Sequence, residues 1–253
     1  MLLRVLLFAL AGVMALLTPP AARALECSNQ TYAGNRYTLC SVAPERDELR
    51  LFLYDPGGRP YGDFAAVNAR LAGEGKQLAF AMNAGMYHED RAPVGHYVED
   101  GEELMRVVPN AGPGNFGLLP NGVLCLTAHR ARVLETLRFE KEHPQCLYAT
   151  QSGPMLVIDG ELHPRFLPDG TSRYIRNGVG TSADGKRAVF VISRNAVSFH
   201  EFASYFRDGL KLPQALFLDG NISRLYAPDL GRNDWGRQMG PIVGVVEDRP
   251  AGE

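Results

Sequence analysis

Asp-Gly and Asn-Gly dipeptides stand between short apolar runs at four places, and they constrain the fold of this chain more than any other feature. The four segments are YVEDGEEL (97–104), LLPNGVLCL (118–126), LVIDGEL (156–162) and TSADGKRAVFVIS (181–193). Such a dipeptide between apolar runs is the strongest short-range signal for a β-hairpin, because both residues tolerate the backbone of a tight turn. The repetition predicts a fold made largely of antiparallel sheet.

Two further segments have helical spacing. Residues 63–73 begin with an N-capping Asp and end with Gly, and residues 198–210 begin with a capping box formed by Ser198 and Glu201. Strands are also predicted over residues 36–42, 48–54, 77–83, 214–219 and 241–247. No linker divides the chain. We therefore expect a single α+β domain over residues 25–253, dominated by mixed or antiparallel β-sheet with a few short helices.

The first 24 residues have the pattern of a secretory signal peptide. Arg4 precedes an apolar run over residues 5–17, and Ala22-Arg23-Ala24 fits the small-x-small rule of a signal-peptidase site. The run is shorter than the roughly 20 residues that a transmembrane helix needs, which disfavours an uncleaved anchor. We expect residues 1–24 to be removed and the mature protein to be exported, periplasmic or secreted, without stable membrane insertion.

The charge balance excludes one class of partner. The chain has 26 Lys and Arg against 28 Asp and Glu, for a formal net charge of −2. Loss of residues 1–24 removes two arginines and no acid, which makes the mature chain more acidic. No basic patch of the kind that binds nucleic acid is present. The sequence leaves the oligomeric state open.

All four cysteines, Cys27, Cys40, Cys125 and Cys146, lie in the part of the chain that we expect to be exported. An even number of cysteines in such a chain indicates two disulfides, for which three pairings exist. We favour the sequence-local pairs Cys27–Cys40 and Cys125–Cys146, each of which would contribute about 2–4 kcal/mol. A metal site of four cysteines is the alternative, and the absence of a C-x-x-C spacing disfavours it.

The short motifs of common hydrolases and nucleotide-binding proteins are absent, so the candidate chemistry lies with polar residues at strand ends. Asn83 ends a predicted buried strand, and Gly85 after it permits the close approach of a ligand. Asp219 ends another apolar run and precedes Gly220. Taken alone, Asp219-Gly220 is more typical of a hairpin turn than of a catalytic site.

Two other segments carry candidate groups. Arg173 and Arg176 are three residues apart and Asn177 follows, so this segment predicts either an anion site or a solvated strand edge. Ser152, before Gly153, offers an alternative nucleophile for an amidase or esterase. That chemistry would require a histidine within hydrogen-bond reach of the serine.

Five blocks of sequence, in this order, resemble the phosphodiester glycosidase family. They are AMNAGMYHEDRAPVG, NFGLLPNGVL, QSGPMLVIDGELHPRF, RNGVGTSADGKRAVFVIS and ALFLDGNISRLYAP, and the resemblance covers roughly residues 49–246. The family includes the lysosomal enzyme that uncovers mannose 6-phosphate by removing N-acetylglucosamine, and many bacterial exported proteins. The resemblance implies an exported hydrolase that cleaves the glycosidic bond of a sugar-1-phosphodiester in envelope or extracellular glycans. A non-catalytic glycan-binding protein of the cell envelope on the same fold is the alternative.

The late signature of the family, Asp-Gly-Gly-Gly-Ser-Thr after a strand, is kept only in part. This chain has DGNISR at residues 219–224, so the Asp, the first Gly and the Ser match. Asn221, Ile222 and Arg224 replace two small residues and the threonine. We expect the bulkier side chains to narrow or reshape the mouth of a site.

The resemblance also implies roles for individual residues. A phosphodiester needs a cation, for which Arg176 is the first candidate, with Arg173 behind it. Cleavage at the anomeric carbon passes through an oxocarbenium-like transition state, and a phosphate leaving group needs little protonation. One carboxylate, Asp219, would then suffice as nucleophile or as base for water. The other predicted substrate-binding residues are Asn177, Gly85, Ser152, Gly153, Gly220, Asn221 and Ser223.

Three predictions concern the surroundings of that carboxylate. Asn83 and Ser223 would position sugar hydroxyl groups, and His96 would be a proton donor. No cofactor is required by the sequence. A calcium ion could bind there, because hard oxygen ligands are available from Asp219, Asn83, Glu89 and Asp90.

Overall fold

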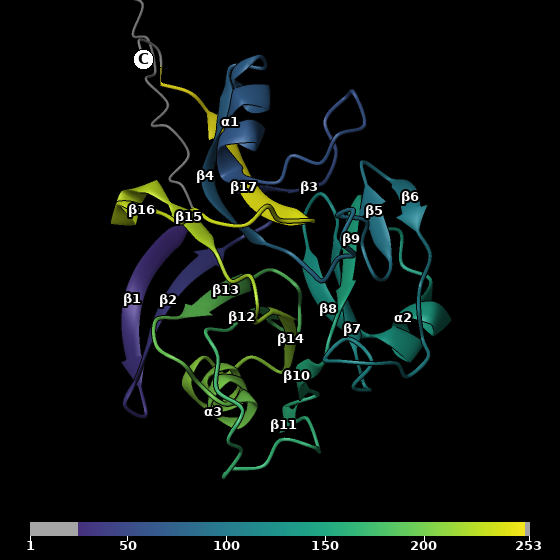
Figure 1. Cartoon of the computed structure of the whole chain (residues 1–253), viewed down its shortest axis with the longest axis vertical. Helices are drawn as coiled ribbons and strands as arrows, with labels where there is room; N and C mark the ends of the chain where they lie inside the picture. Colours follow the sequence, from purple (N-terminus) through teal and green to yellow (C-terminus); the bar gives the residue numbers. More distant parts are fainter. Residues whose placement is uncertain (1–24, 251–253) are drawn as a thin grey trace, which may run out of the picture.

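Residues 25–250 are described by the computed structural model (Figure 1), and the predicted signal peptide lies outside them. Within this range the chain forms three β-sheets and three short α-helices, and neighbouring strands pair antiparallel throughout. The predicted class, a single α+β domain dominated by β-sheet with a few short helices, is confirmed.

The first sheet has seven strands in the order β1-β2-β13-β12-β14-β10-β11. Their bounds are β1 Glu26–Tyr32, β2 Asn35–Val42, β10 Met155–Ile158, β11 Glu161–Leu162, β12 Asn177–Thr181, β13 Ala188–Ser193 and β14 Gln214–Asp219. Two hairpins of this sheet, β10–β11 and β12–β13, contain Asp159-Gly160 and Asp184-Gly185, as predicted.

The second sheet has five strands in the order β16-β15-β4-β17-β3. The bounds are β3 Glu48–Phe52, β4 Lys76–Asn83, β15 Leu225–Ala227, β16 Arg232–Asn233 and β17 Ile242–Asp248, with a 3₁₀ turn, η2, at Pro228–Leu230. Helix α1, Phe64–Ala72, packs on this sheet through its apolar side (Figure 1). Asp63 caps the helix by accepting a hydrogen bond from the Ala66 N–H at 2.8 Å, as the sequence predicts.

The third sheet has the order β6-β5-β9-β7-β8. The bounds are β5 Tyr97–Glu99, β6 Glu102–Met105, β7 Gly122–Leu126, β8 Ala131–Glu135 and β9 Tyr148–Ser152, and helix α2, Thr136–Glu142, follows β8. The predicted hairpin turn at Asp100-Gly101 is confirmed. The one predicted at Asn121-Gly122 is wrong. Asn121 is fully buried and bonds to Phe116 and Thr136, and Gly122 already belongs to β7.

The helix predicted over residues 198–210 is partly π-helical. Helix α3 covers Phe199–Ser204 and continues as a π-helical turn, η1, over Tyr205–Gly209. The predicted capping box is confirmed, because Ser198 Oγ accepts from the Glu201 N–H at 3.1 Å and Glu201 Oε2 accepts from the Ser198 N–H at 2.8 Å. The apolar side of α3 covers one face of the first sheet (Figure 1).

Both predicted disulfides are present. Cys27–Cys40 joins opposite residues of β1 and β2, and Cys125–Cys146 joins β7 to the segment before β9. The four-cysteine metal site is therefore excluded. Among residues 25–250, no helix has the length and apolar character needed to cross a membrane.

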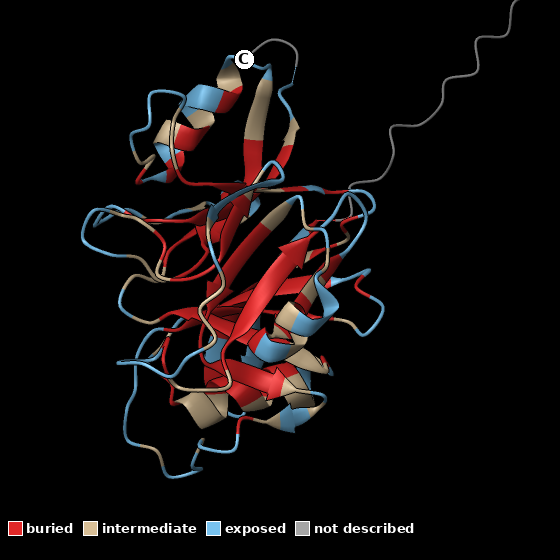
Figure 2. Cartoon of the chain, turned by 90° about the vertical axis from the view of Figure 1, so that its right-hand side faces the viewer, coloured by how far each residue is buried: buried red, intermediate tan, exposed pale blue. Residues whose placement is uncertain are grey.

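The core lies where the three sheets meet. Its largest apolar cluster takes residues from every sheet, including Phe80 of β4, Leu124 of β7 and Phe190 of β13. Figure 2 shows buried strands through the centre of the molecule and exposed residues on loops and outer helix faces. The strand ends around this core are therefore held rigidly, which suits them to carry a site.

Candidate functional site

Strand ends from two different sheets meet at one place. In the second sheet β4 ends at Asn83, and in the first sheet β12 begins at Asn177 and β14 ends at Asp219. Asn177 and Asp219 are partners in the register of β12 and β14. After Asp219 the chain crosses to β15, which pairs with β4. The Asp219-Gly220 turn therefore connects two sheets and does not close a hairpin.

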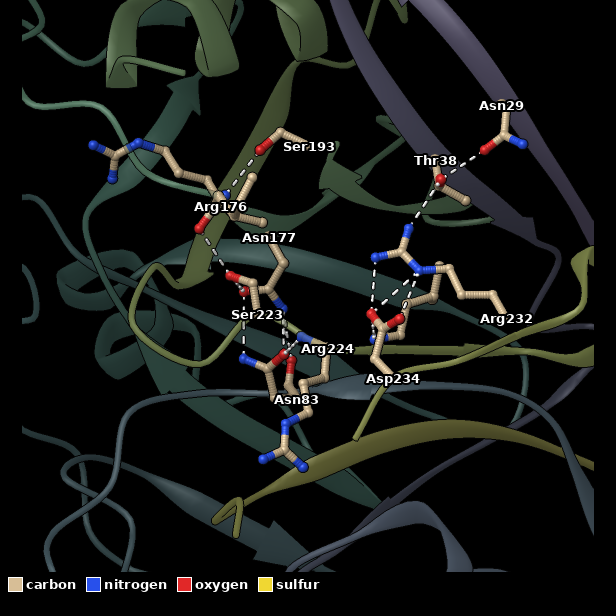
Figure 3. Close-up of polar contacts among 12 residues, drawn as sticks. Asn29, Thr38, Asn83, Arg176, Asn177, Ser193, Ser223, Arg224, Arg232 and Asp234 are labelled. Atoms are coloured by element: carbon tan, nitrogen blue, oxygen red, sulfur yellow. Dashed lines mark hydrogen bonds and ion pairs between the residues drawn. The ribbon is translucent and has the colours of Figure 1, made fainter. Parts of the chain in front are cut away.

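Asn83 and Asn177 join the two sheets through their side chains, which point toward each other in Figure 3. Both residues are fully buried. Asn177 Nδ2 donates to the Asn83 carbonyl at 2.9 Å and to Asn83 Oδ1 at 3.1 Å, while Asn83 Nδ2 donates to Asn177 Oδ1 at 3.3 Å. Asn83 Oδ1 also accepts the Arg224 N–H at 2.9 Å. These amides are occupied with each other, so they hold strand ends in place and are not available to a sugar.

Asp219 has one anchored and one unanchored carboxylate oxygen. Oδ1 accepts the N–H groups of Gly220, Asn221 and Ile222 at 2.5, 2.7 and 3.3 Å. Within residues 25–250, Oδ2 accepts no hydrogen bond. The residue is 8% exposed, and burial raises the pKa of its carboxyl although the three N–H groups act in the opposite direction. The turn thus fixes the direction of a carboxylate whose second oxygen is free to react.

Arg176 is a buried cation that lies beside this turn. Its guanidinium stacks on Phe199, with Cζ 3.7 Å from the ring centroid, and points away from the asparagine pair (Figure 3). Nε donates to the Val197 carbonyl and Nη2 to the Ser172 carbonyl, both at 2.9 Å. In the described part of the chain, no carboxylate pairs with it and Nη1 has no hydrogen-bond partner. Burial lowers the pKa of Arg176 to about 10, so it stays cationic at neutral pH.

Asp219 and Arg176 line one cleft with a volume of about 1030 Å³. Its walls also come from the segments 86–94, 113–116 and 237–238. A cleft of this size accommodates a ligand of two or more sugar rings. The structure therefore brings together the two residues for which the sequence predicted the main chemical roles.

The cleft is cationic although the chain as a whole is acidic. Arg91, Arg176 and Arg237 line it, and Asp219 is the single acid among its lining residues. Among the described residues, none of these three arginines forms an ion pair. Uncompensated guanidinium groups around one carboxylate favour an anionic ligand over a neutral one.

The family-wide sequence profile of phosphodiester glycosidases matches residues 76–246. The chain belongs to the phosphodiester glycosidase family. The match includes every segment that lines the cleft. The family predicted from the five sequence blocks is thereby confirmed, and membership supports a glycosidase-type function.

One curated relative is the uncharacterized protein YigE of Escherichia coli K12. It is 35% identical over 219 residues, which cover 87% of this chain and 83% of YigE. The relationship therefore extends over nearly the whole of both proteins.

Three solved structures share the fold. A hypothetical protein from Synechocystis has a TM-score of 0.60 at 13% identity, over 88% of this chain and 61% of that one. The zebrafish N-acetylglucosamine-1-phosphodiester alpha-N-acetylglucosaminidase catalytic domain, auto-inhibited by its pro-peptide, has a TM-score of 0.58 at 12% identity. The match covers 87% of this chain and 81% of that one. A Burkholderia pseudomallei K96243 protein described as a candidate exported protein has a TM-score of 0.53 at 14% identity. The match covers 83% of this chain and 74% of that one.

The altered residues of the phosphodiester glycosidase signature leave the carboxylate in place. Asn221 and Ile222 hold Asp219 through backbone N–H groups, which any residue type supplies. Their side chains line the cleft, and Ile222 also packs on the apolar cluster under α1. Gly220 lines the cleft as well. Ser223 lies behind the turn, where its hydroxyl faces the Ile175 carbonyl at 3.0 Å and the Asp219 carbonyl at 3.2 Å.

Three predicted substrate-binding residues are buried outside the cleft of this phosphodiester glycosidase. Ser152 is fully buried and donates to the Leu218 carbonyl at 3.0 Å, its one hydrogen bond among the described residues. Neither it nor Gly153 lines the cleft. Gly85, with a φ of +151°, packs so closely on Thr150 that a Cβ would lie 2.8 Å from Oγ1. The placement of Ser152 disfavours the amidase or esterase alternative, because no histidine among residues 25–250 bonds to its hydroxyl.

His96 and Arg173 are also directed elsewhere. The His96 imidazole faces a different cavity, where Nδ1 lies 2.9 Å from the Met105 carbonyl and 3.4 Å from Glu103, and burial lowers its pKa. Arg173 forms an ion pair with Glu201 at 2.8 Å. The prediction that either residue reaches the same site as Asp219 is corrected, because each side chain is fixed by partners outside the cleft.

The predicted calcium ligands are not gathered around Asp219. Asn83 Oδ1 is occupied by two N–H donors, and Glu89 and Asp90 are exposed residues that do not line the cleft. Residues 25–250 contain no group of three or more His, Cys, Asp or Glu side chains placed to hold a metal ion. Calcium binding stays a prediction for the chelator experiment below.

Several cleft residues have no role in the sequence-based prediction. They are Tyr87, His88, Arg91, Tyr174 and Arg237. All five lie in loops or isolated β-bridges, and the spacing patterns that predict helices and strands carry no information about such segments. Tyr87 lies close enough to Asp219 that the carboxylate helps burial to raise the pKa of the phenol. The signal that could have found them is the frequency of arginine and aromatic residues in irregular segments.

Proposed function

We propose that this protein is an exported hydrolase that cleaves the glycosidic bond of a sugar-1-phosphodiester in envelope or extracellular glycans. The main observation in support is the placement of two buried groups in one cleft: a guanidinium without an ion pair and a carboxylate with one unbonded oxygen, both judged among residues 25–250. Membership of the phosphodiester glycosidase family supports the bond type.

Arg176 binds the phosphodiester in this proposal. Nη1 is the guanidinium nitrogen that has no hydrogen-bond partner within residues 25–250, while the ring of Phe199 and two carbonyls hold the rest of the group. Arg91 and Arg237 add positive charge to the same cleft. A charge-assisted contact from a fixed guanidinium both binds the phosphate and stabilises the negative charge that it gains as the leaving group.

Asp219 acts at the anomeric carbon. The C1–O bond breaks, its electron pair leaves with the phosphate oxygen, and the products are a phosphate monoester and a free sugar. Asp219 Oδ2 either bonds to C1 in a glycosyl ester that water then hydrolyses, or accepts a proton from water as the water oxygen bonds to C1. The leaving phosphate is a weak base, so the absence of His96 from the cleft does not obstruct the reaction.

A periplasmic or secreted location agrees with the two disulfides, because disulfides persist in oxidising compartments. The predicted signal peptide supports the same location. Peptide sequencing of the N-terminus of the protein recovered from the periplasm and medium tests this part. A mature chain that begins at Leu25 is expected, and recovery of the intact N-terminus in the cytoplasm would contradict it.

The function is tested with a panel of sugar-1-phosphodiesters that differ in sugar and aglycone, incubated with the purified mature protein with and without EDTA. Release of free reducing sugar from at least one member is expected, and the Asp219→Asn variant should release almost none. Loss of turnover in EDTA, restored by calcium, would confirm the predicted ion. Saturable binding of the panel without any turnover would instead favour the non-catalytic glycan-binding alternative.

A further inference from the structure

A second cavity opens on the other side of the Asn221–Ile222 turn. It has a volume of about 530 Å³, and it is lined by residues 221–224 and by the loop 233–237. Both cavities include Asn221, Ile222 and Arg237 in their walls. A ligand that extends from the first cleft past this turn therefore reaches the second cavity.

Arg224, in the wall of this cavity, is a buried cation that forms no ion pair within residues 25–250. The residue is 6% exposed, and in the described part of the chain its Nη2 has no hydrogen-bond partner. Asp234 shares the cavity wall, but its carboxylate is bound to Arg232 at 2.8 Å and to the Leu225 N–H at 3.0 Å. Burial lowers the pKa of Arg224. An unpaired buried guanidinium is costly, and that cost is relieved when an anion binds to it.

The backbone holds Arg224 in position. Its N–H donates to Asn83 Oδ1 in the amide pair that joins the two sheets, and its guanidinium extends away from that pair (Figure 3). Gly236 has a φ of +148°, and a Cβ there would lie 3.0 Å from Nη2. The loop backbone thus lies directly against the guanidinium, at a place where a larger residue would collide with it.

Trp235 adds an aromatic surface beside this cation. It is 93% exposed, lines the same cavity and is the one tryptophan of the chain. An indole ring in solvent packs on the apolar face of a sugar ring, and a neighbouring guanidinium binds a phosphate or carboxylate. The two groups together match a sugar that carries a negative charge.

We propose that the second cavity is a subsite for an anionic sugar unit, so that the substrate is a multiply charged glycan phosphodiester and not a single capped sugar. The anionic group, a phosphate or a uronic acid carboxylate, binds to Arg224, and the sugar ring packs on Trp235. The inference rests on the proposed function for the place of this unit next to the bond that is cleaved. Binding at the subsite itself is independent of turnover.

Titration of the purified mature protein measures this binding directly. The probes are N-acetylglucosamine 6-phosphate, glucuronic acid, inorganic phosphate and uncharged N-acetylglucosamine, followed by Trp235 fluorescence and by calorimetry. Saturable binding of one or both anionic sugars is expected, with the uncharged sugar weaker by about tenfold or more. The comparison of the first two probes identifies the anionic group. Absence of saturable binding by both methods would overturn the proposal.

Four variants, one of them a control, locate the binding. Arg224→Met should weaken binding of the anionic sugar by about tenfold or more, Arg224→Lys should restore part of it, and Arg187→Met, at an exposed arginine outside both cavities, should not change it. Trp235→Ala removes an exposed ring and leaves the core intact, so it tests the subsite even if Arg224→Met fails to fold. It should weaken the anionic sugar and not inorganic phosphate. If wild type, Arg224→Met and Trp235→Ala bind the anionic sugar with equal affinity, the proposal is overturned.

Kinetics separate the two proposals. The ratio of kcat/KM for a sugar-1-phosphodiester with an anionic aglycone sugar to that with a neutral one should fall by about tenfold or more in Arg224→Met. An unchanged ratio with turnover intact overturns the subsite alone. Full turnover by Asp219→Asn overturns the catalytic role of Asp219 alone, because the binding titration still reports on the subsite.

Discussion

The ends of β14 and β9 present the same sequence pattern, a polar residue followed by glycine, and differ in what the polar atoms contact. At the end of β14, Asp219 Oδ2 accepts no hydrogen bond from the described residues, and the side chain lines a cationic cleft. At the end of β9, Ser152 gives its hydroxyl hydrogen to the carbonyl of Leu218, the residue before Asp219. Both are buried. A polar atom that stays free inside a cleft therefore distinguishes a candidate catalytic group from a structural one.

The largest expected effect tests the Asp219 side of this comparison. Asp219→Asn keeps an oxygen for the turn N–H groups and removes the charge, so kcat should fall by about 10²–10⁴-fold, measured as release of reducing sugar. Asp169→Asn, at an exposed carboxylate outside the cleft, is the matched control and should keep its activity. Turnover at the wild-type rate in Asp219→Asn would contradict the assigned role.

The same variant has a stability readout with a defined sign. Burial raises the pKa of Asp219 in the folded protein, so ionisation costs the folded state stability as the pH rises through that pKa. Asp219→Asn removes this cost at neutral pH. Its Tm at pH 7 should therefore equal or exceed that of wild type, whereas a Tm well below wild type would indicate a structural role instead.

The next effect concerns Arg176. Arg176→Met keeps the length of the side chain but removes the charged N–H groups, so kcat/KM for a phosphodiester should fall by about 10- to 100-fold. Inorganic phosphate should raise the Tm of wild type by more than it raises the Tm of this variant, which keeps only the proposed Arg224 subsite. The exposed Arg187→Met serves as the control for loss of a cation. A rise in Tm as large in Arg176→Met as in wild type would move the anion site of the cleft to Arg91 or Arg237.

The pH dependence of kcat/KM tests the roles of Asp219 and Arg176. The carboxylate is active when ionised, so the acid limb of kcat/KM should lie at a higher pH than an ordinary aspartate gives, because burial raises the pKa of Asp219. Arg176 binds phosphate when protonated, so the alkaline limb should lie near its pKa of about 10. An alkaline limb that is unchanged in Arg176→Lys would assign that limb to another group.

The smallest effect tests the Ser152 side. Ser152→Ala removes one buried hydrogen bond, which should lower the free energy of unfolding by about 1 kcal/mol. Denaturant unfolding measures this change. Because the hydroxyl faces the Leu218 carbonyl and not the cleft, kcat/KM should change by less than about threefold. A loss comparable to that of Asp219→Asn would restore Ser152 as a nucleophile.

Local patterns predicted the elements of the fold well. The caps at Asp63 and Ser198 and three of the four hairpin turns follow from residues within four positions of each other, where turn and capping chemistry acts. Asn121-Gly122 failed because the asparagine side chain found buried partners distant in the sequence. Tertiary packing decided that turn against the local preference.

Only some residues of the predicted site line the cleft. Asp219 and Arg176 were found because they end or precede apolar runs and match the pattern of the phosphodiester glycosidase family. His96 and Arg173 lie near those motifs in the sequence, but their side chains bind Met105 and Glu201. Proximity along the chain says which residues are near a strand end and not which way a side chain points.

The sequence alone therefore predicted the α+β class, the two disulfides and the family, all of which are confirmed. It also proposed Asp219 and Arg176 as the carboxylate and its cation, and the structure places both in one cleft. The tertiary structure decided which polar atoms remain free, because that depends on partners from other sheets. Both outcomes occur here: the Asn83–Asn177 pair joins two sheets by hydrogen bonds, and Arg224 Nη2 has no hydrogen-bond partner among residues 25–250. Hydrogen bonds between distant segments form only when the sheets meet, so they leave no periodic pattern in the sequence.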